Sequence, residues 1–297
     1  MRFFLAVLFA TATLAADHDH DGLSDSLEQK LLERFRPHFM VSTGECDVLP
    51  AEFAEGDAPT VKARNGTLYG HAFAHETGAI ELHWFHLWAN DCGRRSHPLD
   101  VEHVSALVQK VKGDWKARFW FAAAHQDTLC DAAHGARAEH LDAVNRGARV
   151  WISQGKHASF LSLEACARGC GGDRCDSGRA LPEKKIINLG EKDHPLHGAG
   201  WIHSRHWEFT SKLHTDFPAP SLARMVNADG VTSVGSGLRP VQAVVAGANN
   251  ALDHTGNAFT TAGEQTEGSL ALSAEKVGQS LKTAKDKAAR WIRGRTR

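Results

Sequence analysis

Carboxylate side chains recur at every second position near the start of the chain, a spacing that is typical of a calcium-binding loop. Residues 17–28, DHDHDGLSDSLE, fit the pattern D-x-[DN]-x-[DN]-G-x5-E without a mismatch. Calcium takes roughly six to eight oxygen ligands, and a glycine after the third carboxylate permits the sharp turn that such a loop needs. We therefore expect a Ca2+ site with oxygens from Asp17, Asp19, Asp21, the main-chain carbonyl of Leu23, Asp25 and Glu28.

The same residues have a simpler interpretation, an acidic helix N-terminus that Ser24 or Asp25 caps. The interleaved His18 and His20 should point outward into solvent. If a signal peptide is cleaved just before Asp17, no helix enters the loop and the site is half of an EF-hand. We expect such a loop to hold the chain end in place.

A second polar cluster lies further along the chain, between two aromatic runs. Alternation along a strand beginning near Asp100 places the side chains of Asp100 and Glu102 on one face. Two carboxylates on one face repel each other unless a cation or a proton lies between them. We expect a second divalent cation (Ca2+, Mg2+, Mn2+ or Zn2+) held by Asp91, His97, Asp100 and Glu102. The alternative is a solvated edge strand with ordinary salt bridges.

Two histidines are candidates for proton transfer at such a site. His157, in the sequence GKHA, and His103, directly after Glu102, could each act as a general base, and His157 could also be a metal ligand. A core or capping histidine is an equally good interpretation of His157. Residues 201–208, WIHSRHWE, could add further groups to the pocket.

Cysteine usage indicates an oxidising compartment. An even number of cysteines after a leader favours disulfides, whose pairing cannot be read from the sequence. An alternative for the last three is a zinc knuckle, although their spacing differs from the usual pairs. The six are Cys46, Cys92, Cys130, Cys166, Cys170 and Cys175.

Short aromatic and β-branched runs between turn-forming residues predict the elements that must position these side chains. They are Ile80–Trp88, Val101–Val111, Lys116–Ala124 and Arg149–Ser153. Leu27, Leu31, Leu32 and Phe35 lie at helical spacing, and Pro37 ends that run. We expect a mainly β protein, a β-sandwich with long loops, an N-terminal calcium loop followed by a helix, and a C-terminal amphipathic helix.

The ends of the chain differ in composition from its middle. Residues 1–16 resemble a signal peptide, with a basic residue, an apolar run and small residues, so we expect a secreted, periplasmic or otherwise extracytoplasmic protein. One metal-binding domain then spans 17–240, and the small polar residues of 241–268 predict a linker. Residues 269–297 predict a basic amphipathic helix.

The balance of 34 Lys+Arg against 35 Asp+Glu gives no general reason to expect nucleic acid as a partner. The basic helix is suited to an anionic membrane surface. Docking of its apolar stripe on the domain or on a second copy of the chain is the alternative.

The polar cluster also resembles a known family. The run HPLDVEH from His97 to His103, after the aromatic strand Trp84–Trp88, is similar to the His-x-x-Asp-Trp-Glu-His core of the vacuolar protein sorting 62 family. VWISQGKHASF, residues 150–160, is similar to that family's Gly-Ser-His-Ala-Tyr strand and turn. Asp17–Pro37 resembles its Asp-rich loop and helix, so the similarity extends over residues 17–210.

The same core resembles the necrosis- and ethylene-inducing-like proteins, secreted β-sandwich cytolysins that hold a divalent ion and bind plant sphingolipid head groups. The resemblance implies metal-ligand roles for His97, Asp100 and Glu102, and for Asp91 if the intervening loop is shortened. Val101 stands where the motif has Trp, and the Gly-His-Arg start of the cytolysin motif is absent. Toxin activity is therefore not implied.

These features favour a metal-stabilised binding module that recognises a glycan or lipid head group at a cell surface. The alternative is a metal-dependent hydrolase in which the ion activates water and His157 or His103 moves protons. The sequence contains no serine elbow, zincin motif or phosphate loop. A third possibility is a structural surface protein without a small ligand.

Overall fold

The computed structural model describes residues 16–93, 96–126, 128, 131–169, 172–182, 184, 186–190, 199–205, 207 and 209–235. All of these lie in the first of two units into which the chain divides, Met1–Asn250. The expected signal peptide, except Ala16, and the expected linker and C-terminal helix lie outside the described residues. No described helix is long and apolar enough to cross a membrane.

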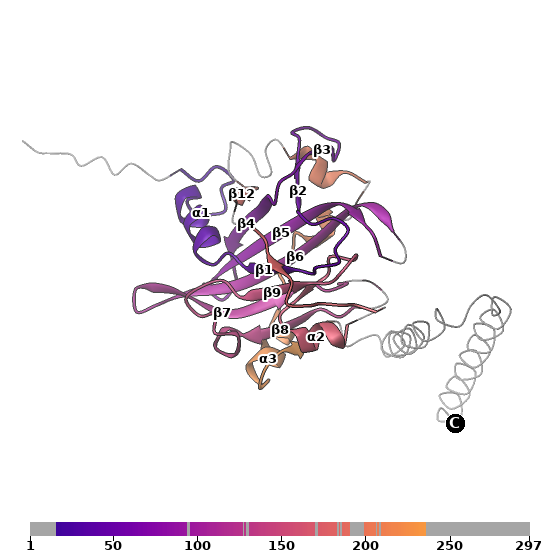
Figure 1. Cartoon of the computed structure of the whole chain (residues 1–297). Coiled ribbons are helices and arrows are strands. Elements are labelled where there is room, and N and C mark those ends of the chain that lie inside the picture. Colours follow the sequence, from indigo (N-terminus) through magenta and orange to yellow (C-terminus); the bar gives the residue numbers. More distant parts are fainter. Residues whose placement is uncertain are drawn as a thin grey trace, which may run out of the picture. The chain divides into compact units, whose positions relative to one another are not determined.

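A seven-stranded sheet forms the centre of the domain (Figure 1). Its strand order is β12-β4-β5-β6-β7-β8-β13, and all neighbours are antiparallel except β12 and β4. The strands are β4 (Leu68–Ala74), β5 (Ile80–Asp91), β6 (His97–Val111), β7 (Asp114–Ala122), β8 (His134–Arg137), β12 (Ile186–Asn188) and β13 (Thr232–Ser233).

A four-stranded sheet with the order β10-β9-β1-β11 packs on one face of this central sheet. Its strands are β1 (His38–Val41), β9 (Arg149–Ile152), β10 (Ser159–Phe160) and β11 (Arg179–Ala180). A separate pair consists of β2 (Ala51–Phe53) and β3 (Val61–Arg64).

The core between the two sheets consists of alternate residues from facing strands. Phe39 and Val150 of the smaller sheet share one buried cluster with Trp84 and Val104 of the larger. The Phe39 and His86 rings meet across the interface with centroids 4.9 Å apart. This arrangement is a β-sandwich, as predicted.

The far face of the central sheet is covered by irregular chain and short 3-10 helices. A second buried cluster there joins Tyr69 and Phe85 of the sheet to Trp201 and Phe209. Since β5 is covered on both sides, its side chains are buried from Ile80 to Ala89, in contrast to the usual in-out alternation. The short 3-10 helices are η1 (Ala138–Leu141), η2 (Gly200–His203) and η3 (Phe209–Lys212).

The predicted first helix is α1 (Asp25–Arg34), which lies beside β12 and β4 (Figure 1). Leu31 and Leu32 are buried, and a side chain at Gly70 would place its Cβ 2.6 Å from Leu32 Cδ1. The indole of Trp84 donates a 3.0 Å hydrogen bond to the Leu32 carbonyl. Helix α2 (Leu163–Ala167) and α3 (Ala219–Val226) complete the fold, α3 packing on β8.

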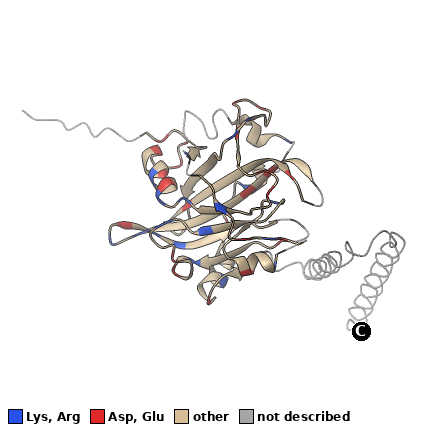
Figure 2. Ribbon diagram, in the orientation of Figure 1, with Lys and Arg blue, Asp and Glu red and all other residues tan. Residues whose placement is uncertain are grey.

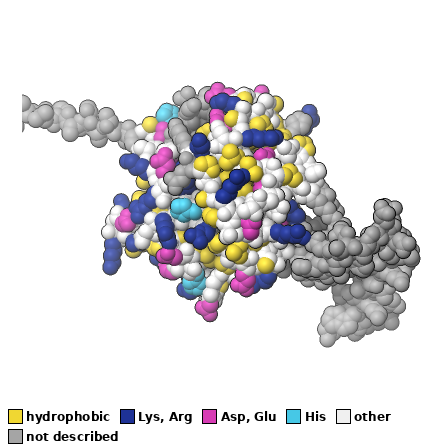
Figure 3. Space-filling view, viewed as in Figure 1, with side chains coloured by type: hydrophobic (Ala, Val, Ile, Leu, Met, Phe, Trp, Pro, Cys, Tyr) yellow, Lys and Arg dark blue, Asp and Glu magenta, His cyan; other side chains and the backbone are white. Residues whose placement is uncertain are grey.

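Charged residues of both signs are interspersed along the described chain (Figure 2). On the face drawn in Figure 3, hydrophobic and charged side chains are likewise interspersed.

The four predicted strands are all present, but two are longer than expected. Strand β5 continues to Asp91 and β6 begins at His97, so both residues lie in paired strands and not in a loop between the two aromatic runs. Backbone pairing extends past the aromatic run because Asp91 and His97 face each other in the ladder.

Candidate functional site

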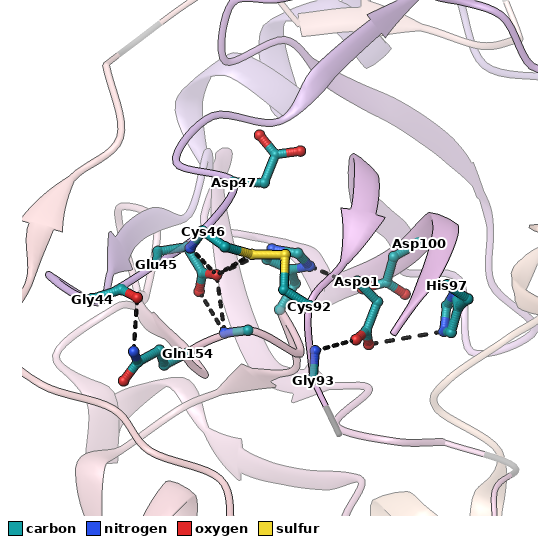
Figure 4. The surroundings of a disulfide bond; sticks show 12 residues. Gly44, Glu45, Cys46, Asp47, Asp91, Cys92, Gly93, His97, Asp100 and Gln154 are labelled. Carbon is teal, nitrogen blue, oxygen red and sulfur yellow. Dashed lines mark hydrogen bonds and ion pairs between the residues drawn. A yellow bond between two sulfur atoms is a disulfide. The ribbon is translucent and has the colours of Figure 1, made fainter. Parts of the chain in front are cut away.

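The metal-site candidates of the polar cluster converge at the end of the β5–β6 hairpin. The register pairs Asp91 with His97 and Trp88 with Asp100, so residues separated in sequence become neighbours. One ligand atom each of Asp91, His97 and Asp100 lies within 4.8 Å of the other two. Figure 4 shows these three side chains gathered beside the disulfide.

The disulfide anchors this end of the hairpin. Cys92 follows Asp91 and is bonded to Cys46, with Cα atoms 6.5 Å apart. The Cys92 N–H donates to the Gly155 carbonyl at 2.7 Å, and the Asp91 carboxylate accepts a 2.6 Å bond from Gly93 N–H. These contacts fix Asp91 where its other oxygen lies 3.8 Å from His97 Nε2.

The group is open to solvent on one side and closed on the other. The His97 side chain is 53% exposed, and that of Asp91 16% exposed. Burial raises the pKa of the Asp91 carboxyl, and the nearby Asp100 adds to the rise. An ion that binds here would therefore neutralise the repulsion between the Asp91 and Asp100 carboxylates, and it could keep some of its own water ligands on the exposed side.

Glu102 lies behind this group, on the same strand face as Asp100. It is outside the set of ligand atoms that lie within 4.8 Å of one another. Its Oε2 is buried and has no hydrogen-bond partner among the described residues. Burial raises the pKa of Glu102 to about 8; the charge of Lys212 opposes this rise, and that of Asp100 adds to it.

His157 is held between two carboxylates at the inner wall of the site. Its Nδ1 lies 3.1 Å from Asp100 Oδ2, and its Nε2 lies 3.5 Å from Glu45 Oε1. The ring stacks on Trp88 with centroids 4.0 Å apart. Although burial lowers the pKa of His157, hydrogen bonds to Asp100 and Glu45 raise it to about 9. The imidazole is therefore protonated at neutral pH, a poor state for a general base.

Glu45 is a site residue that sequence reasoning missed. Its two oxygens each lie 2.9 Å from the donating Gly155 N–H, and Oε1 also accepts from the Cys46 N–H. Burial raises the pKa of Glu45, but His157 outweighs this and the pKa is lowered. The only sequence signal was its position before Cys46, and the partner of Cys46 was not known.

His103 does not belong to this site. It follows Glu102 on β6, and strand alternation turns it to the opposite face of the sheet. There its Nε2 lies 2.9 Å from Asp216 Oδ2. Residues 201–208 were expected to add polar groups to the pocket. Trp201 and Trp207 instead pack in the aromatic cluster on that same far face. His206 and Glu208 lie outside the described residues.

A second disulfide joins Cys166 and Cys175, so the alternative of a zinc knuckle on these two sulfurs is wrong. The described disulfides agree with the expected oxidising compartment, and secretion itself stays a prediction. Cys130 and Cys170 lie outside the described residues.

The N-terminal loop brings together three of its expected ligands. Carboxylate oxygens of Asp17, Asp19 and Asp21 lie within 4.8 Å of one another. Asp17 Oδ1 and Asp21 Oδ2 are buried without a hydrogen-bond partner among the described residues. Burial raises the pKa of Asp19 and of Asp21, and repulsion within the group adds to both shifts.

Other loop residues are engaged elsewhere. Asp25 accepts hydrogen bonds from the main chain and ring of His18, so His18 is paired within the loop, although its side chain is 42% exposed. Burial raises the pKa of Asp25, but the bonds from His18 outweigh it and lower the pKa. Glu28 accepts a 2.9 Å bond from Asn188 Nδ2. The Ser24 side chain makes no capping hydrogen bond to α1.

No protein-family model and no curated protein sequence matches the chain. Among solved structures, NLPPya in complex with glucosamine is 14% identical, with 73% of this chain and 96% of that chain covered and a TM-score of 0.41. NLPPya in complex with mannosamine is 11% identical, with 72% and 95% covered and a TM-score of 0.40. Necrosis and Ethylene inducing Protein 2, from the causal agent of cocoa's Witches Broom disease, is 12% identical, with 65% and 89% covered and a TM-score of 0.40.

These neighbours come from one of the two families that the sequence resembles. At such identities and TM-scores the likeness carries no argument about the function of this chain. Membership of the vacuolar protein sorting 62 family stays a prediction.

Proposed function

We propose that this protein binds a divalent cation at the end of the β5–β6 hairpin and uses it to recognise the hydroxyl groups of a sugar head group. The observation that carries the proposal is the convergence of Asp91, His97 and Asp100 at a partly exposed position. The buried, unpartnered Oε2 of Glu102 supports it, because a buried polar atom is nearly always paired with a hydrogen-bond donor or an ion.

The donor set fits a hard or borderline cation. Two carboxylates, one imidazole and a nearby third carboxylate suit Ca2+, Mg2+, Mn2+ or Zn2+. When bound, such an ion supplies positive charge and positions for neutral oxygen ligands. The surrounding protein shields the carboxylates from water on one side. His97 is exposed, so the other side of the site is accessible to a ligand.

The protonation and the position of the two candidate general bases favour a binding function over hydrolysis. His157 is fully buried, protonated and occupied by two carboxylates, so it cannot take a proton from water. His103 lies across the sheet. The role of His157 is instead to balance the charge of Asp100 and to tie the turn after β9 to the hairpin.

The N-terminal loop is proposed as a separate calcium site with a structural role. Its three clustered carboxylates and two unpartnered buried oxygens support this assignment. Helix α1 follows directly and packs on the central sheet, so calcium would fix the start of the domain rather than contact a ligand.

The test of sugar recognition measures binding of glucosamine and mannosamine to the full chain by ligand-detected NMR. We expect binding in calcium or manganese, loss of binding in chelator, and loss in His97→Ala. Asp142→Asn is the control, since that carboxylate is 90% exposed and remote from the hairpin. Equal binding with and without chelator would refute metal-mediated recognition. Binding only to sugar-bearing lipid vesicles would assign the head group to a lipid.

A further inference from the structure

A buried cluster of two histidines and an aspartate lies across the central sheet from Asp100 and Glu102. His83 on β5 pairs with Ser105 in the ladder, which places its side chain beside that of His103 on β6. Asp216 reaches the pair from the segment between η3 and α3. The three side chains are 1%, 0% and 0% exposed respectively.

The distances between these side chains match those around a small ion. His103 Nε2 lies 2.9 Å from Asp216 Oδ2, and His83 Nδ1 lies 3.6 Å from the same oxygen. Ligand atoms of a tetrahedral zinc ion with bonds of about 2.0 Å lie about 3.3 Å apart. The two rings stack with centroids 5.5 Å apart, so both present their edges to Asp216.

The surroundings of His83 fix which nitrogen is available. Its Nε2 lies 2.8 Å from Glu81 Oε1, and Glu81 is held by the Asp216 N–H at 2.7 Å and by the Thr215 hydroxyl at 2.8 Å. Metal-binding histidines commonly donate their other ring N–H to a carboxylate in this way. With Nε2 protonated toward Glu81, the lone pair of Nδ1 is directed at Asp216.

Several atoms of the cluster lack partners. His83 Nδ1, His103 Nδ1 and Asp216 Oδ1 are buried and have no hydrogen-bond partner among the described residues. Buried polar atoms in native proteins are nearly always satisfied, and an ion bound between His83 and Asp216 would satisfy His83 Nδ1 and Asp216 Oδ1.

A cavity borders the cluster. Asp216 lines a cavity of about 520 Å3 whose other walls include His214, Thr215 and Phe121. The Phe121 ring lies 6.0 Å from that of His103. Because the three side chains are at most 1% exposed, an ion would enter from this cavity through a local opening at Asp216, and water could then supply a fourth ligand.

We propose that His83, His103 and Asp216 bind a zinc ion at a site separate from the β5–β6 hairpin end, with Glu81 and Ser105 as positioning residues. Two imidazoles and one carboxylate suit zinc better than calcium. The Ser105 hydroxyl donates to Asp216 Oδ2 at 2.5 Å and so orients that carboxylate. This inference does not depend on the proposed sugar site.

The test uses the full chain carrying His97→Ala, which removes the imidazole of the other site. We expect one tightly held zinc per chain by elemental analysis after dialysis, and none in the same chain with Asp216→Asn added. His38→Gln, at an exposed histidine, is the control and should retain the ion. Cobalt loaded in place of zinc should give the visible absorption bands of a four-coordinate site.

Extended X-ray absorption fine structure of the zinc-loaded His97→Ala chain gives a result that does not depend on the folding of Asp216→Asn. Two imidazole ligands at the zinc support the proposal. Absence of tightly bound zinc in the folded His97→Ala chain, zinc retained in folded Asp216→Asn, or an absorption spectrum without imidazole ligands would each overturn it. Failure of the protein to bind sugar would not count against this zinc site, because the two proposals rest on different residues.

Discussion

The clustered carboxylates of the N-terminal loop predict an effect whose sign depends on calcium. Two unit charges 4.8 Å apart repel by about 1 kcal/mol in water-like surroundings, and Asp17, Asp19 and Asp21 form three such pairs. The double variant Asp19→Asn, Asp21→Asn removes all three repulsions. These repulsions sum to about 3 kcal/mol at full strength, and salt screens part of that sum, so in chelator we expect the free energy of unfolding to rise by about 1 to 3 kcal/mol.

In calcium the same variant should be destabilised. A site occupied at about 100 times its dissociation constant stabilises the fold by roughly 2.7 kcal/mol, and the variant forfeits this amount. The raised pKa values of Asp19 and Asp21 add a pH test. A raised carboxyl pKa means that the folded form binds more protons. Stability of the wild type in chelator should therefore fall as the pH rises through the region above 3.8, the ordinary pKa.

The assay is urea unfolding of the full chain in calcium and in chelator, with Asp142→Asn as a control at a 90% exposed carboxylate. The control should change stability equally in both buffers. Equal destabilisation of the double variant in calcium and in chelator would show that these aspartates support the fold without an ion, and the calcium-loop assignment would be refuted.

Three further predictions concern other parts of the chain. Replacing Cys46 and Cys92 with serine should lower the free energy of unfolding, measured by urea unfolding, by roughly 2 to 5 kcal/mol. The same replacement should weaken manganese binding at the hairpin end, measured by calorimetry. Unchanged manganese affinity would show that the disulfide does not position the site. Burial raises the pKa of Asp173, but the hydrogen bonds from His125 and Ser153 and the charges of His125 and Lys156 together outweigh it and lower the pKa. The stabilising effect of Asp173 is therefore complete above the ordinary value of 3.8 and is lost as the pH falls through the folded value. Asp173→Asn should flatten this acid limb of the stability curve, and an unchanged limb would argue against the pair with His125. Deletion of residues 269–297 should abolish binding to anionic vesicles, measured by co-sedimentation; no binding by the intact chain would end that prediction.

The sequence predicted the β-sandwich and its central strands because aromatic and β-branched runs coincide with strands buried in the core. Ile80–Trp88 lies within β5 and Val101–Val111 within β6. It did not predict β4, where Gly70 and His71 interrupt the apolar pattern. Gly70 is required there by the close approach of Leu32, a tertiary contact that no local pattern contains.

The candidate site was predictable where ligands lie on one hairpin and unpredictable where they come from elsewhere. Asp91, His97 and Asp100 are close in sequence, so their convergence followed from strand pairing. Glu45 reaches the site through the Cys46–Cys92 disulfide, and Asp216 reaches His103 from 113 residues away. Alternation along β6 assigns His103 to the face opposite Glu102, but no local pattern indicates that this far face is also buried.

The most direct measurement is an anomalous-scattering map of crystals of the full chain grown with manganese. We predict a peak between the carboxylates of Asp91 and Asp100, within bonding distance of His97 Nε2. Manganese bound elsewhere in the molecule, with no peak among these three side chains at a saturating concentration, would contradict the account.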